Sequence, residues 1–242
     1  MMTPVVITVL IAAGLGAFIV VQSQQQSEQL EQADAVAADY LSAVAMFRAG
    51  VVKAVKKPDP ESPQAIRKAL IAAIDEPPVL AEANSFGIEK STAYMLAEEV
   101  EAGLLEPYRE VSAELKRASV ALAYVKTARE VLDMRITDYV TSTTLSDSVE
   151  LRSTLIPAFV SARERLAAAT VPKGQEKLAA TVDAAVQYLI DQASTLASSI
   201  DDRRNYSFTY ASQFEVAITA VEDYATKVTG DLTESLNELE DL

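Results

Sequence analysis

Three long stretches of this chain contain neither glycine nor proline, and this absence constrains the fold most strongly. The stretches are Ala17–Ala49, Tyr108–Ile156 and Gln175–Thr229. Gly and Pro are the residues that most often interrupt regular structure, so each stretch can hold a long helix. The whole chain has only 7 Gly and 9 Pro, whereas alanine occupies 40 positions. No segment between the breaks alternates apolar and polar residues as a strand does, so we expect an all-α protein.

Apolar residues recur inside these stretches with alternating spacings of three and four. This spacing is typical of helices that bury one stripe of side chains, and a sustained repeat of 3.5 residues favours coiled-coil-like packing. Arg129 falls on the second stripe, so we expect either a shift of register or an arginine that extends to solvent. The first stripe contains Leu30, Ala33, Ala37, Tyr40, Val44, Phe47, Val51 and Ala54, the second Tyr108, Val111, Leu115, Ala118, Leu122 and Val125, and the third Leu178, Val182, Ala185, Leu189, Gln192 and Leu196.

The breaks divide the chain into an anchor, a bundle and a tail. We expect a transmembrane anchor over residues 1–23, an elongated antiparallel helical bundle over 24–229, and an acidic amphipathic tail over 230–242. The individual helices are expected over residues 4–57, 63–75, 88–140, 147–169 and 172–228, with kinks at Gly103, Pro107 and Pro157. Because the helix over 147–169 is shorter than its two long neighbours, part of their apolar surface lacks a neighbour within the chain. That shortfall predicts an oligomer or a partner protein.

The segment Val5–Val21 contains 17 residues without a charge. A helix of about 20 apolar residues spans the hydrocarbon core of a bilayer, so this segment is a short candidate span. An uncleaved signal anchor is the favoured interpretation. The alternatives are a cleaved secretory signal, although no Lys or Arg precedes the apolar core, and a buried helix of a soluble or filamentous assembly.

The flanks of this segment say little about its orientation, because the first basic residue is Arg48. We expect a single-pass protein of the cytoplasmic (inner) membrane, with the N-terminus inside and the bulk of the chain extracytoplasmic. Within the segment, Ala12 and Gly16, and likewise Ala13 and Ala17, are small residues four positions apart. Such pairs allow two helices to approach closely in a bilayer, so these four residues are a candidate helix-packing site.

Composition excludes several classes of site. The chain has no Cys and no His, so disulfides, Cys/His zinc sites and Ser-His-Asp or Cys-His nucleophiles cannot form. The formal net charge is −14, which argues against nucleic acid as a partner because phosphate binding requires clustered Lys and Arg. No glycine-rich phosphate loop occurs either. We therefore expect no catalytic, cofactor or metal site, and a chain that is not an enzyme.

One polar and aromatic cluster interrupts the Ala/Leu-rich region near residue 200. Two acidic residues there are followed by Arg203, Arg204, Tyr206, Phe208 and Tyr210. Arg and Tyr are favoured anchors of protein interfaces, so these five residues are a candidate partner contact. The alternative is a helical segment whose aromatic rings fill core space beside small alanines.

These features together favour a non-enzymatic, membrane-anchored structural or accessory subunit of a membrane complex or envelope filament. Its expected partners are the lipid bilayer and either further copies of itself or another membrane protein complex, through helix–helix packing. The first alternative is an extracytoplasmic ligand-binding or sensory helical bundle that signals through a partner. The second alternative is a helical effector that inserts into a membrane.

Overall fold

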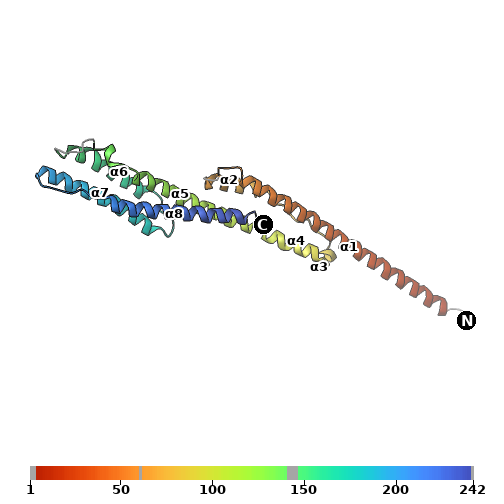
Figure 1. Ribbon diagram of the computed structural model, residues 1–242. Helices are drawn as coiled ribbons and strands as arrows, with labels where there is room; N and C mark the ends of the chain where they lie inside the picture. Colours follow the sequence, from red (N-terminus) through yellow and green to blue (C-terminus); the bar gives the residue numbers. More distant parts are fainter. Residues whose placement is uncertain (1–3, 60–61, 141–146, 241–242) are drawn as a thin grey trace. The chain divides into compact units, whose positions relative to one another are not determined.

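The computed structural model describes the backbone of residues 4–59, 62–140 and 147–240, and side chains from Gln24 onward in the same ranges. Every regular element in these ranges is helical (Figure 1). The α-helices are α1 (Pro4–Val55), α2 (Pro63–Ala73), α3 (Ser85–Lys90), α4 (Thr92–Gly103), α5 (Glu106–Leu132), α6 (Ile156–Ala168), α7 (Glu176–Asp201) and α8 (Ala211–Glu238). A 3₁₀ turn, η1 (Ile136–Asp138), and a π-helical turn, η2 (Leu151–Leu155), lie between α5 and α6. The expected all-α class is therefore confirmed.

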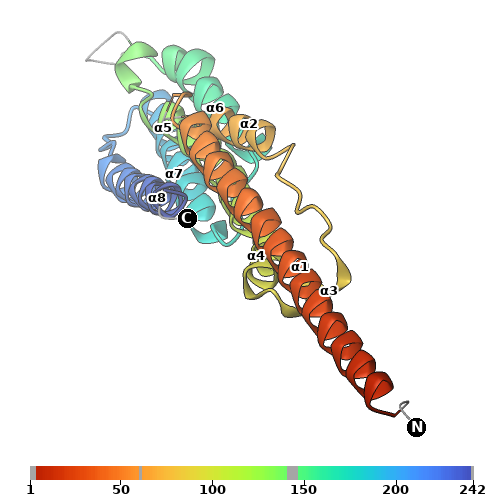
Figure 2. The same cartoon turned by 90° about the vertical axis from the view of Figure 1, so that its right-hand side faces the viewer.

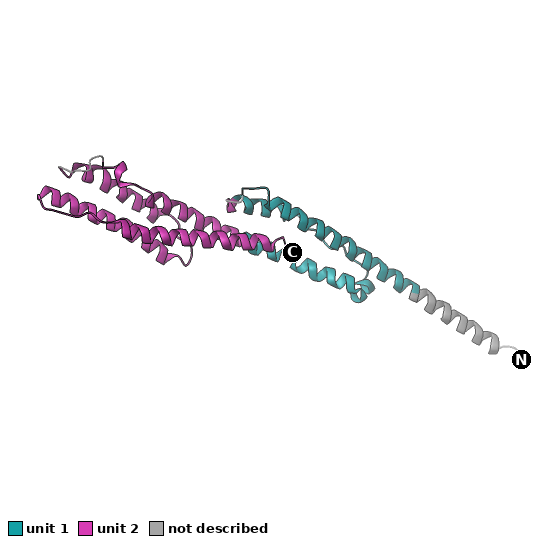
Figure 3. Cartoon of the chain, viewed as in Figure 1, with its two compact units in different colours: residues 1–60, 65–112, 242 teal, residues 61–64, 113–241 magenta. Residues whose placement is uncertain are grey.

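The chain forms two compact units (Figure 3). Unit 1 comprises residues 1–60, 65–112 and 242, and unit 2 comprises residues 61–64 and 113–241. The division falls inside α5, which begins in unit 1 and continues into unit 2. The sequence predicts one bundle over residues 24–229, and the contacts instead gather the helices of that range into two groups.

Helix α1 is a single α-helix of 52 residues that includes the whole apolar segment Val5–Val21. The part with described side chains, Gln24–Val55, is itself long and apolar enough to cross a membrane, with a mean hydropathy of 1.4 in its most apolar window. Only 22% of that window is buried. Its buried side chains Ala33, Ala37, Tyr40, Val44 and Val51 occupy the predicted stripe, whereas the buried Val55 falls outside it.

In unit 1, short helices α3 and α4 pack against α1 through polar contacts at their first turns. Asn84 caps α3 by accepting a hydrogen bond from the Gly87 amide at 2.7 Å, and its side-chain amide donates to the Gln29 carbonyl on α1 at 2.9 Å. Ser91 caps α4 by accepting from the Tyr94 amide, and its hydroxyl donates to Asp34 on α1 at 2.5 Å. Each cap therefore both starts a helix and joins it to α1.

Gly87 permits the close approach of α3 to α1. A Cβ atom at this position would lie 2.5 Å from the Ala33 Cβ atom and 3.0 Å from the Gln29 carbonyl oxygen. Those separations are shorter than van der Waals contact, so no larger residue fits without movement of one helix. Here the glycine serves packing rather than backbone conformation, since it lies within a regular helix.

The prediction of one helix over residues 88–140 is wrong. Ser91 interrupts it with an extended backbone (φ −77°, ψ 116°), because its hydroxyl satisfies the first amides of α4 in place of a preceding helical turn. A second break at Leu104 and Leu105 lies just before Pro107, as expected of a proline near the start of a new helix. The helix then ends at Leu132 rather than at residue 140.

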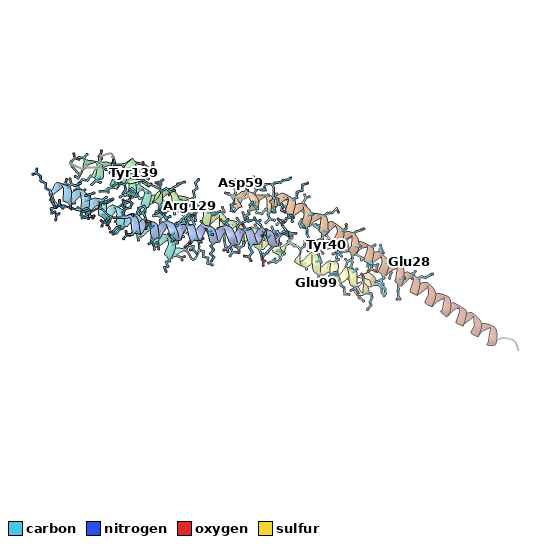
Figure 4. All side chains as sticks on the ribbon, viewed as in Figure 1. Glu28, Tyr40, Asp59, Glu99, Arg129 and Tyr139 are labelled. Carbon is cyan, nitrogen blue, oxygen red and sulfur yellow. The ribbon has the colours of Figure 1, made fainter. Side chains whose placement is uncertain are left out.

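Unit 2 is a helical bundle around one apolar core. Helix α7 packs against both α6 and α8, and Figures 1 and 2 both show α7 and α8 side by side. The second stripe shifts register in α5 near Arg129, because Ala128, Val131 and Leu132 are buried there. Arg129 itself, labelled in Figure 4, is half exposed, and it pairs with Glu222 of α8 at 2.5 Å. Both outcomes expected at this arginine thus occur together.

Pro157 causes the irregularity expected within residues 147–169. The turn before it is π-helical, and the Ile156 amide donates to the Leu151 carbonyl five residues earlier. Proline has no amide proton, and its ring crowds the carbonyl four residues before it. The wider π turn accommodates both effects, after which α6 continues to Ala168.

The prediction of one helix over residues 172–228 is also wrong, both at the start of the helix and in its middle. It begins at Glu176 after a turn that contains Gly174 in the left-handed region (φ 79°), and it ends at Asp201. Helix α8 then starts at Ala211. It continues through Gly230 to Glu238, so the predicted boundary at residue 230 falls inside a helix.

Candidate functional site

The predicted helix-packing residues Ala12, Ala13, Gly16 and Ala17 lie in α1, outside the residues whose side chains the structure describes. Their backbone belongs to the same helix that contacts α3 and α4 further along. Close packing of these four residues against a second helix therefore stays a prediction.

The predicted partner-contact residues lie in the connection between α7 and α8, not within a helix. Helix α7 ends in a Schellman motif, in which the Arg204 amide donates to the Ser199 carbonyl and the Arg203 amide donates to the Ile200 carbonyl. Arg203 takes the left-handed conformation (φ 55°) that this motif requires and that glycine usually supplies. The helical interpretation of this cluster is thus corrected, because the motif turns the chain out of the helix.

The aromatic residues of this connection attach it to the core of unit 2. The Tyr206 hydroxyl donates to the Gln192 side chain on α7. The rings of Phe208 and Tyr210 lie 5.4 Å apart, and Tyr210 meets Phe214 of α8 edge to face at the same distance. Tyr206, Phe208 and Tyr210 are all half-buried. Their rings therefore supply packing as well as any surface for a partner.

The ring series continues into the bundle. The ring centroid of Phe214 lies 6.4 Å from that of Phe159 of α6. The centroid of Phe159 lies 6.1 Å from that of Tyr139, a half-buried residue labelled in Figure 4. Edge-to-face pairs at these separations add stability beyond the apolar area that they bury. The aromatic series therefore joins the α7–α8 connection to α8, α6 and the residues after η1.

The arginines of the connection are oriented differently from its rings. Arg203 and Arg204 are both exposed, and Arg204 pairs with Asp202 two residues earlier at 2.6 Å. Two cationic groups thus extend from a segment whose rings are attached to the core. Contact of these arginines with a partner stays a prediction.

Beside this connection, one carboxylate links two segments that are distant in sequence. Asp201 accepts hydrogen bonds from the Ser148 hydroxyl at 2.6 Å and from the Arg152 guanidinium at 2.7 Å. The Ser148 hydrogen bond, and then the Arg152 hydrogen bond, hold the pKa of Asp201 below its ordinary value. Sequence reasoning missed this site, because no local pattern pairs residues about 50 positions apart.

A groove that sequence reasoning also missed runs along one side of α8. It is lined by residues 113–121 of α5, residues 170–175 of the α6–α7 loop and residues 224–232 of α8, and it has a volume of about 890 Å³. We call it the lysine groove, because Lys116, Lys173 and Lys227 line it. Two of these lysines directly flank buried stripe positions, at Leu115 and Val228, which is the one signal that the sequence offers.

A second groove, of about 830 Å³, lies between α5 and the C-terminal half of α8. Its lining is mixed, with Thr226, Thr229 and Thr233 from α8, and Arg129 from α5. Arg129 is already paired with Glu222, and that hydrogen bond first of all raises the pKa of Arg129. Of the two grooves, the lysine groove is therefore the one with an excess of cationic side chains.

Unit 1 contains a buried phenol without a hydrogen-bond partner. The Tyr40 hydroxyl lies on α1, where the residue is 4% exposed, and it bonds to no group among the described residues. Burial, and then the Glu101 carboxylate, raise the pKa of Tyr40. Within the described side chains, no three Asp or Glu residues gather in the way of a metal site.

Comparison with known proteins yields no relative. No family model, no curated protein sequence and no solved structure matches this chain.

Proposed function

We propose that this chain is a non-enzymatic, single-pass subunit of the cytoplasmic (inner) membrane that anchors a helical bundle for assembly with itself or a partner complex. The observation that carries the proposal is the continuity of α1. Its uncharged segment Val5–Val21 and the residues that pack on α3 and α4 belong to one helix without an intervening linker. One helix therefore contains the candidate membrane span and also takes part in folded unit 1.

The span in this proposal is Val5–Val21 rather than Gln24–Val55. The later segment packs on α3 and α4, and it carries Asp34, which receives the Ser91 hydroxyl bond. Inserting Gln24–Val55 into a bilayer would break these contacts and place charged groups in hydrocarbon, which is costly. The earlier segment carries no charge, so it can enter a bilayer without such a loss.

Membrane fractionation tests the anchor. We expect the full chain to stay in the membrane after alkaline carbonate extraction, and the variant Ile11→Lys/Leu15→Lys to be released, because each lysine near the middle of a span costs about 2.5–3.5 kcal/mol. The matched control is Val36→Lys/Met46→Lys in the later apolar window, which should stay bound. Release of the control with retention of the first variant would contradict the proposed span.

The absence of cysteine makes the topology measurable. A single Ser207→Cys variant carries the only thiol in the chain, and residue 207 is exposed in the α7–α8 connection. An impermeant maleimide should label it in intact cells if unit 2 lies outside the cytoplasm, whereas a Thr3→Cys variant should need lysis. The reverse pattern would overturn the orientation.

Assembly is tested by mass. Chain extracted in a mild detergent should run as an oligomer or with a partner, and its mass should exceed that of one chain by mass photometry or native mass spectrometry. A monodisperse single chain would contradict the proposed role in assembly. Elongated antiparallel packing of coiled-coil type in the assembled bundle would accord with the buried stripe residues of α1, α5, α7 and α8.

The lysine groove supports a second candidate function, an extracytoplasmic ligand-binding bundle that acts through a partner. A cleft with an apolar base and a few convergent polar groups is the usual form of a ligand site. Binding of a small molecule that raises the unfolding temperature would favour this function over a purely structural one.

A further inference from the structure

The base of the lysine groove is apolar and made largely of small residues. Ala118 and Ala121 of α5 and Val228 and Leu232 of α8 line it, and all four are nearly buried. The α6–α7 loop closes one side with Val171, which remains 39% exposed. The nine-residue spans of α5 and α8 along the groove, residues 113–121 and 224–232, give it a length of about 12 Å between their first and last Cα atoms. An elongated apolar body fits this shape.

The rim of the groove is cationic in an acidic chain. Four cationic and two anionic side chains line it, whereas the whole chain has a formal net charge of −14. Glu114 is paired with Arg117 three residues along α5, which removes both from the balance. Lys116, Lys173 and Lys227 make no ion pair among the described residues. Three cationic groups therefore face one remaining carboxylate, Asp231.

One phenol of α8, that of Tyr224, also lines the lysine groove. Tyr224 lies one helical turn from Lys227, and its side chain lines the groove while half-buried. Burial first, and then the Asp231 carboxylate, raise the pKa of this phenol, so it keeps its proton at neutral pH. A protonated phenol can donate a hydrogen bond to an anion, and none of the described groups accepts from it.

We propose that the lysine groove binds a single-chain amphipathic anion, either a long-chain carboxylate or a lysophospholipid. The alkyl chain would lie on the Ala118, Ala121, Val228 and Leu232 surface, and the anionic group would face Lys116, Lys173 and Lys227. Burial of the chain provides most of the affinity, and the lysines select the sign of the charge. This inference does not depend on the proposed membrane anchor, because every residue involved lies in unit 2.

Photo-crosslinking tests the site on the full chain mixed with phosphatidylcholine vesicles, whose net charge is zero, so that the test does not require insertion of the chain. Three diazirine probes share one alkyl chain and carry a carboxylate, a hydroxyl or a trimethylammonium group. We expect the carboxylate probe to label peptides from residues 113–121, 170–175 and 224–232 more strongly than the other two probes. Comparable labelling by all three probes, or labelling of these peptides by none, would overturn the proposal.

Two variants with equal net charge locate the effect. The variant K116Q/K173Q/K227Q should reduce carboxylate labelling of the groove by at least about threefold, because it removes all three cationic groups that face the anion. The control K68Q/K126Q/K177Q removes three exposed lysines elsewhere and should label as the unmodified chain does. Equal losses in both variants would show a general charge effect and refute the site.

Steric blockage and competition complete the test. Ala113 lines the groove and is exposed, so Ala113→Phe should obstruct part of the groove without disturbing the buried base and should reduce labelling by all three probes. Unchanged labelling in this variant would contradict the location. Excess decanoate and excess lysophosphatidylglycerol, added separately as competitors, distinguish the two sources of the anion, and competition by neither would overturn the ligand class. Failure of the anchor would appear only in fractionation, so the two proposals fail independently.

Discussion

In unit 1, α3 and α4 are held to α1 by polar caps and by one glycine, whereas in unit 2 the helices share an apolar core crossed by a series of aromatic rings. The buried cluster on which α3 and α4 pack is smaller and includes Tyr40 and Tyr94, while the larger cluster of unit 2 includes Phe159, Leu189 and Phe214. We therefore expect the attachment of α3 and α4 to depend more on single contacts than the core of unit 2 does. Substitutions at matched positions can test this difference.

The largest effect is expected from Phe159→Ala in unit 2. Phe159 is fully buried between Tyr139 and Phe214, and truncation of a buried Phe costs about 3–5 kcal/mol. Hydrogen exchange measured by mass spectrometry should show faster exchange in α6, α7 and α8. Protection of α3 and α4 that falls equally would contradict a role of Phe159 confined to the core of unit 2.

The next effect is expected from Gly87→Ala in unit 1. The new Cβ atom would meet the Ala33 Cβ atom and the Gln29 carbonyl, so we expect a loss of about 1–3 kcal/mol from overpacking. Hydrogen exchange should accelerate in α3 and along residues 29–33 of α1. If this variant is as stable as the unmodified chain, the close approach of α3 to α1 is not a constraint.

Ser91→Ala should cost less, at about 0.5–2 kcal/mol, because it removes the α4 cap together with the hydrogen bond to Asp34. Ser91→Thr keeps a hydroxyl and provides the control. Thermal unfolding followed by circular dichroism, with hydrogen exchange to locate the change, measures both. A neutral Ser91→Ala variant would show that apolar contacts alone hold α4.

Gly230→Ala should stabilise unit 2, in contrast to Gly87→Ala. A Cβ atom at residue 230 would meet nothing within 4 Å, and alanine favours a helix over glycine by about 0.5–1 kcal/mol. The free energy of unfolding in urea should rise for Gly230→Ala. A decrease would contradict the continuous helix through residue 230.

The smallest effect concerns the pH dependence of the Asp201 site. Because Ser148 and Arg152 lower the pKa of Asp201 in the folded chain from the ordinary 3.8, the pairing contributes stability above pH 3.8. That contribution is lost as the pH falls through the lower folded pKa. In Asp201→Asn this part of the acid dependence should disappear, and the carboxyl signal of Asp201 in the unmodified chain should titrate below 3.8 by NMR. Titration at or above 3.8 would contradict the network.

The sequence predicts helix class and buried faces better than helix ends. Stripe residues such as Ala33, Leu115 and Leu189 are fully buried, because a repeat of three and four positions selects one face whatever that face meets. The breaks at Ser91 and Arg203 were not predicted, since a serine cap and a left-handed arginine resemble ordinary helix residues until their partners are known. Both depend on hydrogen bonds made in the folded chain.

A candidate site can be predicted from this sequence only where its residues are neighbours along the chain. The arginines and aromatic residues near 203–210 form one run in the sequence, so they could be selected as a group. The lysine groove instead combines Lys116, Lys173 and Lys227 from three separated segments, and the Asp201 site combines two. Tertiary contacts, not composition, bring such residues together.

The continuity of α1 also sets an angular phase. Successive residues of an α-helix are turned by about 100°, so the direction of the Val5–Val21 surface relative to the Ala33 and Ala37 face is determined by residue count alone. One alanine inserted after Ser27 would rotate the two surfaces by about 100° against each other, whereas seven would nearly restore their alignment. The affinity of any partner that contacts both surfaces should therefore fall after one inserted residue and largely recover after seven.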